Sequence, residues 1–243
     1  MNLDPNLVKE FTPTGKLRAS LNLGNPVLAH SRTAAERPAG VSIDMARQFA
    51  SYLGVDVQLI EFETAGKSVD ALTREQADIG FMAIDPLRAT GIHFTPPYVQ
   101  IEGCYLVAHG SPIRSNEEVD RGGIQVVVGN ASAYDLYLSR TLQHASLVKV
   151  PTSEAVVDAM LEGKLPVAAG VRQQMEADAT RIGGLRLLPE RFMVINQAMA
   201  MPRERSAAAH ALLDDFVQVL KASGFVGQAL ARHGIAGAKV APA

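Results

Sequence analysis

The sequence has no tryptophan, a single cysteine and few aromatic residues. Only 5% of its 243 residues are Phe, Tyr or Trp, which argues against the stacking platform that binds single-stranded nucleic acid. Cys104 has no second cysteine with which to form a disulfide or a Cys-x-x-Cys site. We therefore expect no disulfide and no cysteine-based metal or redox centre.

The sequence also has no excess of charge and no long apolar run. The formal net charge of −2 offers no basic surface to nucleic acid or anionic lipid. Apolar stretches such as residues 124–128 fall far short of the ~20 residues that span a bilayer. With 47% hydrophobic and 20% charged residues, the composition is typical of a soluble globular protein. We predict no nucleic-acid partner and no membrane insertion, and a small solute is the partner class that fits.

The first residues lack the features of an export signal. Residues 1–17 read MNLDPNLVKEFTPTGKL, which contains acids and lysines but not the apolar run of about 7–15 residues that a signal peptide requires. Two locations stay open. The protein is cytoplasmic if residue 1 is the true start, and periplasmic if a signal has been removed.

Short apolar runs bounded by turn residues alternate with amphipathic segments, which is typical of βα units on a largely parallel sheet. We expect strands at residues 17–23, 55–62, 78–84, 103–108, 125–129, 166–170, 185–188 and 192–201. The expected helices are residues 42–53, 67–74, 132–142, 153–161, 172–181, 204–222 and 225–232. The small-residue tail at 236–243 is expected to fray.

Three features that suggest nucleotide, metal or nucleophile sites do not meet their requirements. A phosphate loop needs a glycine five residues before Gly66, and that position holds Glu61. The six histidines show neither the i, i+4 spacing on a helix nor a carboxylate at ligand spacing that a metal site needs. Ser132 lacks the flanking glycines of a nucleophile elbow. We predict no cofactor, no metal site and no catalytic residue among these segments.

Residues 77–100 read ADIGFMAIDPLRATGIHFTPPYVQ. This segment resembles the pattern D-h-h-h-S-h-S-h-T-x-x-R, followed by h-x-F-S/T-x-P-Y, of bacterial extracellular solute-binding proteins of family 3, which serve polar amino-acid ABC transporters. Residues 38–44, 121–126 and 127–134 match further family segments in the same order. The resemblance extends from about residue 15 to residue 234.

The resemblance implies a two-lobed α/β fold of the Venus-flytrap type (periplasmic-binding-protein type II), with two hinge-crossing strands. Lobe one would be residues 1–102 plus 195–243 and lobe two residues 103–194, with the ligand between them. It also implies a monomer that binds a carboxylate-bearing solute and presents it to the membrane subunit of an ABC-type uptake system. The alternative is a dehydratase-like or cofactor-biosynthesis enzyme on the same scaffold, with Glu102 and Asp85 as candidate acid or base.

Several ligand contacts follow from the resemblance. Arg88 matches the family's arginine that holds the ligand α-carboxylate, and its planar fork of donors suits that group. Phe81 and Ala83 stand where the family has two hydroxyls. The family's strand-to-helix turn, whose amides can receive a carboxylate, matches Asn130, Ala131 and Ser132. We also expect a contact from Asn25, in the turn that ends the first expected strand.

The sequence departs from the family where an aspartate holds the ligand ammonium. Residues 170–172 read Gly-Val-Arg at that place, and Lys67 aligns with a ligand-facing apolar position. Arg172 and Lys67 would therefore join Arg88 around the ligand. This predicts an anionic mono- or dicarboxylate rather than a zwitterionic amino acid, and Glu102 is the one acid considered as an ammonium partner.

Overall fold

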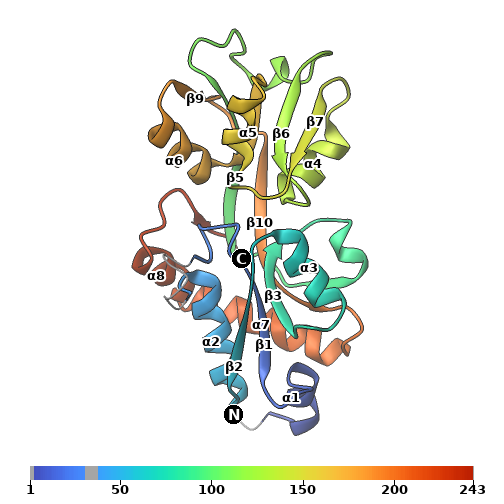
Figure 1. Cartoon of the computed structure of the whole chain (residues 1–243). Helices are drawn as coiled ribbons and strands as arrows, with labels where there is room; N and C mark the ends of the chain where they lie inside the picture. The colour runs from blue at the N-terminus through green and yellow to red at the C-terminus, as the bar shows by residue number, and fades with distance from the viewer. Residues whose placement is uncertain (1–2, 31–37, 243) are drawn as a thin grey trace. The chain divides into compact units, whose positions relative to one another are not determined.

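The computed structural model describes residues 3–30 and 38–242 (Figure 1). The chain forms two compact units, the first comprising Met1–Gln100 and Asn196–Ala243 and the second Ile101–Ile195. It leaves the first unit within strand β5 (Val99–Ala108) and returns within β10 (Met193–Pro202). Which residues move together as a lobe stays a prediction, with the expected boundaries after residue 102 and before residue 195.

The first unit is built on a mixed sheet. Its strand order is β2 (Val57–Phe62), β1 (Leu17–Asn22), β3 (Ile79–Ala83) and β10. Strand β1 runs parallel to β2 and β3, whereas β10 is antiparallel to β3 and also pairs with the short β4 (Ile92–Phe94). Every residue of β3 is buried, so the carboxyl end of this strand is held firmly.

The helices of the first unit cover this sheet. They are α1 (Pro5–Phe11), α2 (Val41–Leu53), α3 (Ala65–Thr73), α7 (Ala207–Ala222) and α8 (Phe225–Arg232). Helix α3 packs on β1 and β3, α2 packs on β1 and α8, and α1 packs on α7. Gly54 ends α2 with φ 70°, a left-handed conformation that glycine adopts without a steric penalty.

The expectation of a frayed C-terminal tail is wrong. Residues Lys239 and Val240 form the short strand β11, which pairs with Gln100 and Val99 at the start of β5. The backbone N–H of the buried Ala241 donates to the Tyr98 carbonyl at 3.0 Å. Backbone pairing, which side-chain composition does not reveal, therefore orders this segment.

The second unit has its own sheet, in the order β5, β8 (Val167–Val171), β6 (Gln125–Gly129) and β7 (Ser146–Val150), with β9 (Leu185–Leu187) also paired to β5. Strand β6 is parallel to β7 and β8, and β5 is antiparallel to β8 and β9. Three helices follow strands of this unit: α4 (Ala133–Thr141), α5 (Val156–Glu162) and α6 (Arg172–Ile182).

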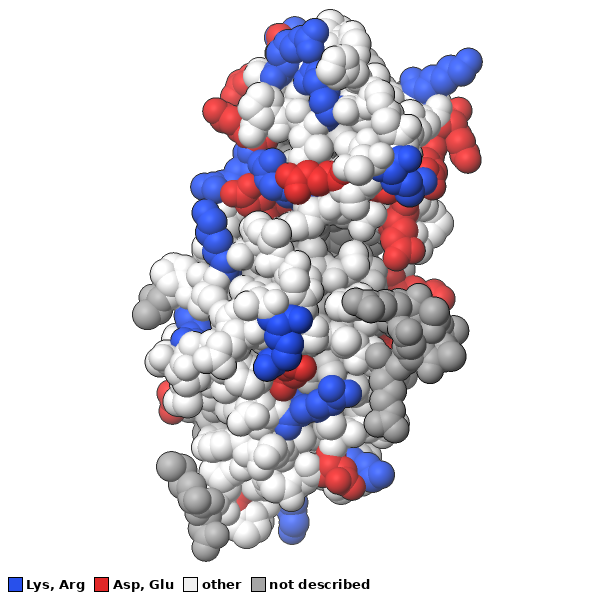
Figure 2. Space-filling model, turned by 90° about the vertical axis from the view of Figure 1, so that its left-hand side faces the viewer, with Lys and Arg blue, Asp and Glu red and all other residues white. Residues whose placement is uncertain are grey.

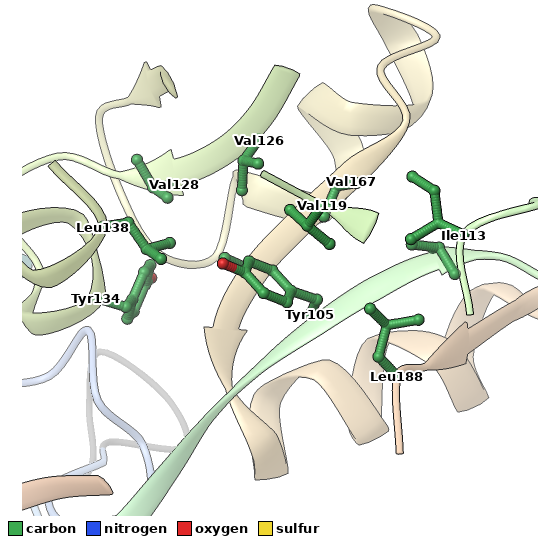
Figure 3. Close-up of a cluster of buried hydrophobic side chains, with 11 residues drawn as sticks. Tyr105, Ile113, Val119, Val126, Val128, Tyr134, Leu138, Val167 and Leu188 are labelled. Carbon is green, nitrogen blue, oxygen red and sulfur yellow. The ribbon is translucent and has the colours of Figure 1, made fainter. Parts of the chain in front are cut away.

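Both faces of the second sheet are buried. Val126 and Val128 of β6 join a cluster with Tyr134 and Leu138 of α4, seen in Figure 3, whereas Val127 joins a separate cluster. That second cluster includes α5 and α6 side chains, namely Val156, Val157, Met160 and Met175. Successive strand residues point to opposite faces, which explains why β6 reads as a continuous apolar run rather than an alternating one.

Among residues 3–30 and 38–242, no helix combines the length and the apolar character needed to cross a bilayer.

Candidate ligand-binding site

Arg88 lies just beyond the carboxyl end of β3, at the start of a short 3-10 turn, Arg88–Thr90. The residue is only 6% exposed, and its Nη1 donates to the carbonyl of Ala83 at 3.0 Å. The buried Asp85 supports the turn, because its carboxylate accepts the backbone N–H of Leu87 at 2.8 Å. Local backbone contacts thus fix a cation at the end of a fully buried strand.

The burial of Arg88 has an electrostatic consequence. Desolvation lowers the pKa of Arg88 from its usual value to about 10, while the charge of Asp85 acts in the opposite direction. The guanidinium therefore stays charged at neutral pH although burial disfavours its charged form. An anion in contact with it would recover part of that free energy, which is the chemistry of a carboxylate-binding residue.

Apart from Asp85, the residues of β3 and of the turn that precedes Arg88 include several apolar side chains. Phe81 and Ala83 are both buried, and the Phe81 ring meets the Tyr98 ring edge-on with centroids 6.2 Å apart. Ile84 and Leu87 are exposed by 40% and 62%. Ala83 contributes its backbone carbonyl to Arg88, which is a positioning contact, and its expected place beside the ligand stays a prediction.

Asn25 has an unused hydrogen-bonding atom. Its Oδ1 is buried and has no hydrogen-bond partner among the residues that the structure describes. Its backbone carbonyl accepts the N–H groups of Leu28 and Ala29, which fixes the turn after β1. A buried acceptor of this kind suits a ligand N–H or O–H group.

Lys67 is placed differently from Arg88. It lies in the first turn of α3, which Thr64 caps by accepting the Lys67 N–H. Its Nζ contacts Glu63 Oε2 at 3.0 Å, and the two side chains are 60% and 79% exposed. The structure thus pairs Lys67 with Glu63 at the surface, and a ligand contact for it stays a prediction.

In the second unit, backbone N–H groups of the turn before α4 already donate hydrogen bonds to other groups of the chain. The Asn130 N–H donates to the Val150 carbonyl, and the Ala131 N–H donates to Asp135 Oδ2 at 2.8 Å. Ser132 is the N-cap of α4 and accepts the Asp135 N–H at 3.0 Å. Part of the amide donor set expected to receive a ligand carboxylate therefore already binds the chain's own carboxylate.

Asp135 was not anticipated from the sequence. Its side chain is 1% exposed and accepts from Ser139 Oγ at 3.1 Å, and Lys149 Nζ lies 2.9 Å away as the counter-charge. The spacing of Ser132 and Asp135, three residues apart before an apolar helix, is the signal that could have predicted it.

Glu102 and Arg172, two residues predicted separately, meet in the second unit. Arg172 Nε donates to Glu102 Oε2 at 2.8 Å, and Arg191 Nη1 donates to Glu102 Oε1 at 2.8 Å. The hydrogen bond from Arg191, and next that from Arg172, lowers the pKa of Glu102 although its burial opposes this. Glu102 is therefore ionised, and each of its carboxylate oxygens accepts a hydrogen bond from one arginine. Arg191 was not among the predicted residues.

On the face of the second unit that Figure 2 shows, positively and negatively charged side chains lie close to one another. Within the described part of the chain, no group of three or more His, Cys, Asp or Glu side chains is placed to hold a metal ion.

Comparison with known families identifies the chain. The family model described as bacterial extracellular solute-binding proteins, family 3, matches residues 25–234. The chain belongs to this family. Its sequence is also 26% identical over 223 residues to a membrane-bound lytic murein transglycosylase F of Sodalis glossinidius, covering 88% of this chain but 47% of that protein. The chain thus spans about half the length of the curated relative it matches.

Solved structures similar to this family 3 protein share the type II periplasmic-binding-protein fold. A binding component of an ABC transporter from Wolinella succinogenes, complexed with lysine, aligns with a TM-score of 0.76 and 21% identity over 90% of this chain and 95% of that one. An ArgBP mutant from T. maritima aligns with a TM-score of 0.78 and 17% identity, covering 94% and 99%. The ancestral amino acid-binding protein AncCDT-1, a precursor of cyclohexadienyl dehydratase, gives 0.77 and 17% over 93% and 97%.

Residues 170 and 171 of this family 3 protein lie against packed side chains. A Cβ at Gly170 would lie 2.5 Å from Cε of Met175, whose side chain is fully buried. Val171 is the N-cap residue of α6 and packs against the apolar cluster of Figure 3. Both positions are therefore used for packing rather than for charge.

Proposed function

We propose that this family 3 protein binds a small solute through a carboxylate that contacts Arg88. The observation that supports this most directly is the burial of the Arg88 guanidinium at the carboxyl end of β3, where burial lowers its pKa to about 10. A carboxylate in contact with the guanidinium would offset part of its desolvation. Asn25 would supply an acceptor to the same solute.

The charge of the solute is the finer part of the proposal. With apolar residues at 170 and 171, no acid stands where the family holds an ammonium, which favours a mono- or dicarboxylate without a compensated α-ammonium. The contacts proposed in the second unit are Asn130, Ala131, Ser132 and Arg172. Lys67 would have to break its ion pair with Glu63 to contact the ligand, so we expect it to contribute least to the binding free energy.

We further propose that the protein serves an ABC-type uptake system, in the periplasm, by presenting the solute to a membrane subunit. Family membership supports this role, and several similar structures are binding proteins of ABC transporters. The enzyme alternative has less support from the site. Glu102 is fixed by two arginines and its lowered pKa makes it a poor proton donor, and Asp85 is buried in a backbone contact.

The test is a thermal-shift screen, followed by calorimetry, of the twenty amino acids beside an equal panel of mono- and dicarboxylates. We expect at least one plain carboxylate to raise the melting temperature in a saturable way, and the Arg88→Ala variant to lose that shift. Stabilisation by lysine or arginine alone, with every plain carboxylate silent, would contradict the proposed anionic ligand. Conversion of a bound compound to a product, followed by NMR, would favour the enzyme alternative.

A further inference from the structure

One carboxylate joins three separate segments of the second unit. Glu102 belongs to β5, Arg172 begins α6, and Arg191 lies in the segment that leads into β10. The two contacts from the arginines to Glu102 are both 2.8 Å and use different carboxylate oxygens. We call these three residues the Glu102 clamp. The Glu102 and Arg172 side chains are about one-quarter exposed, so solvent and solutes reach them.

A second glutamate, outside the Glu102 clamp, balances its charge. Arg172 Nη1 also lies 3.9 Å from Glu176 Oε1, so two arginines face two glutamates. Two of the guanidinium donors, Nε of Arg172 and Nη1 of Arg191, already bind Glu102. The lowered pKa of Glu102 keeps it ionised across the neutral range, so it continues to bind both arginines at neutral pH.

An anion that approaches Arg172 therefore meets a site in which an internal carboxylate is already bound. It must displace Glu102 or accept the remaining donors beside a like charge, and like charges at close range disfavour binding. Replacing the glutamate by glutamine keeps the shape and one acceptor oxygen but removes the competing charge. The two arginines would then face only Glu176 and would carry a net positive charge.

We propose that Glu102 is a built-in competitor that weakens the contact between Arg172 and an anionic ligand, by occupying one donor each of Arg172 and Arg191. The inference deepens the proposed function and rests on it in one respect, that Arg172 contacts the ligand. It assigns a specificity role to Glu102 and to Arg191, whose side chain is half-exposed.

The experiment compares Glu102→Gln with Glu176→Gln in the full chain, with succinate as the probe in calorimetry at low salt. The two variants make the same change of charge near Arg172, but only the first removes a carboxylate at 2.8 Å. We expect Glu102→Gln to bind succinate about tenfold more tightly than wild type and Glu176→Gln to change affinity by less than about twofold. Adding Arg172→Gln to Glu102→Gln should abolish the gain.

Equal succinate affinity of wild type and Glu102→Gln, or an equal gain in both glutamine variants, would overturn the inference. Glu102→Ala serves as the second variant should the glutamine protein not fold, and it must show the same gain. The proposed function is judged separately, by whether Arg88→Ala weakens binding to the wild-type ligand. A gain in Glu102→Gln without an Arg88 effect supports the clamp and contradicts the proposed role of Arg88.

Discussion

Replacing Arg88 by alanine should weaken ligand binding by a magnitude that the structure allows us to work out. Burial lowers the Arg88 pKa from its usual value to about 10, which corresponds to about 3 kcal/mol against the charged form at about 1.4 kcal/mol per pKa unit. A bound carboxylate can return free energy of this order. We therefore expect Arg88→Ala to lose about 2–4 kcal/mol of binding free energy, roughly 30- to 700-fold in Kd.

The measurement is calorimetric titration with the carboxylate that gives the largest thermal shift. Arg88→Lys should fall between wild type and alanine, because it keeps the charge but loses the planar fork of donors. Arg47→Ala, which removes an exposed arginine of α2, is the matched control and should bind normally. The unliganded Arg88→Ala protein should unfold within about 1 kcal/mol of wild type, because losing the hydrogen bond to Ala83 offsets relief of the buried charge. Full affinity in Arg88→Ala would refute the reasoning.

Two further predictions concern acid stability and cofactors. The His210 ring stacks on His93 with centroids 4.0 Å apart, and burial, followed by the charge of His93, lowers the pKa of His210 from 6.5 although nearby carboxylates oppose this. A lowered histidine pKa means that the unfolded chain takes up the proton at a higher pH than the folded protein, so stability should fall as the pH drops below about 6.5. In urea unfolding between about pH 7 and 5, the stability of His210→Phe should therefore depend less on pH than that of wild type. An unchanged pH dependence would contradict this assignment. Because Glu61 replaces the phosphate-loop glycine and Lys67 pairs with Glu63, ATP, zinc and chelator should leave the melting temperature unchanged, and a saturable ATP-dependent rise would be the opposite result.

The sequence predicted most elements of the fold because their apolar patterns are strong. The expected strand at 125–129 and helix at 225–232 coincide with β6 and α8. Strand β7 was missed because it has no fully buried residue and therefore no clear pattern. Helix α1 was missed because its seven residues bury only Phe11, although Asp4 caps it and Pro5 occupies its first turn.

The candidate site divides into contacts that spacing can predict and contacts that only folding creates. Glu63 and Lys67 are four residues apart on the sequence, so their ion pair was open to prediction. Glu102 is 70 residues from Arg172 and 89 from Arg191 along the chain. No local sequence pattern indicates a contact between residues so far apart in the chain. The sequence therefore suggested Arg172 as a cation facing the ligand, and did not predict its ion pair with Glu102.

The two crossings of the chain, within β5 and β10, also order events during synthesis. The second unit is a contiguous segment, so it is complete once Ile195 has left the ribosome. The first unit then still lacks β10, the antiparallel neighbour of β3, together with α7 and α8. At roughly 5–20 residues per second, the remaining residues take several seconds to arrive. Strand β3, which leads to Arg88, is therefore synthesised early but pairs with β10 late. During that interval the apolar side chains of β3 must be kept from contacts with other surfaces.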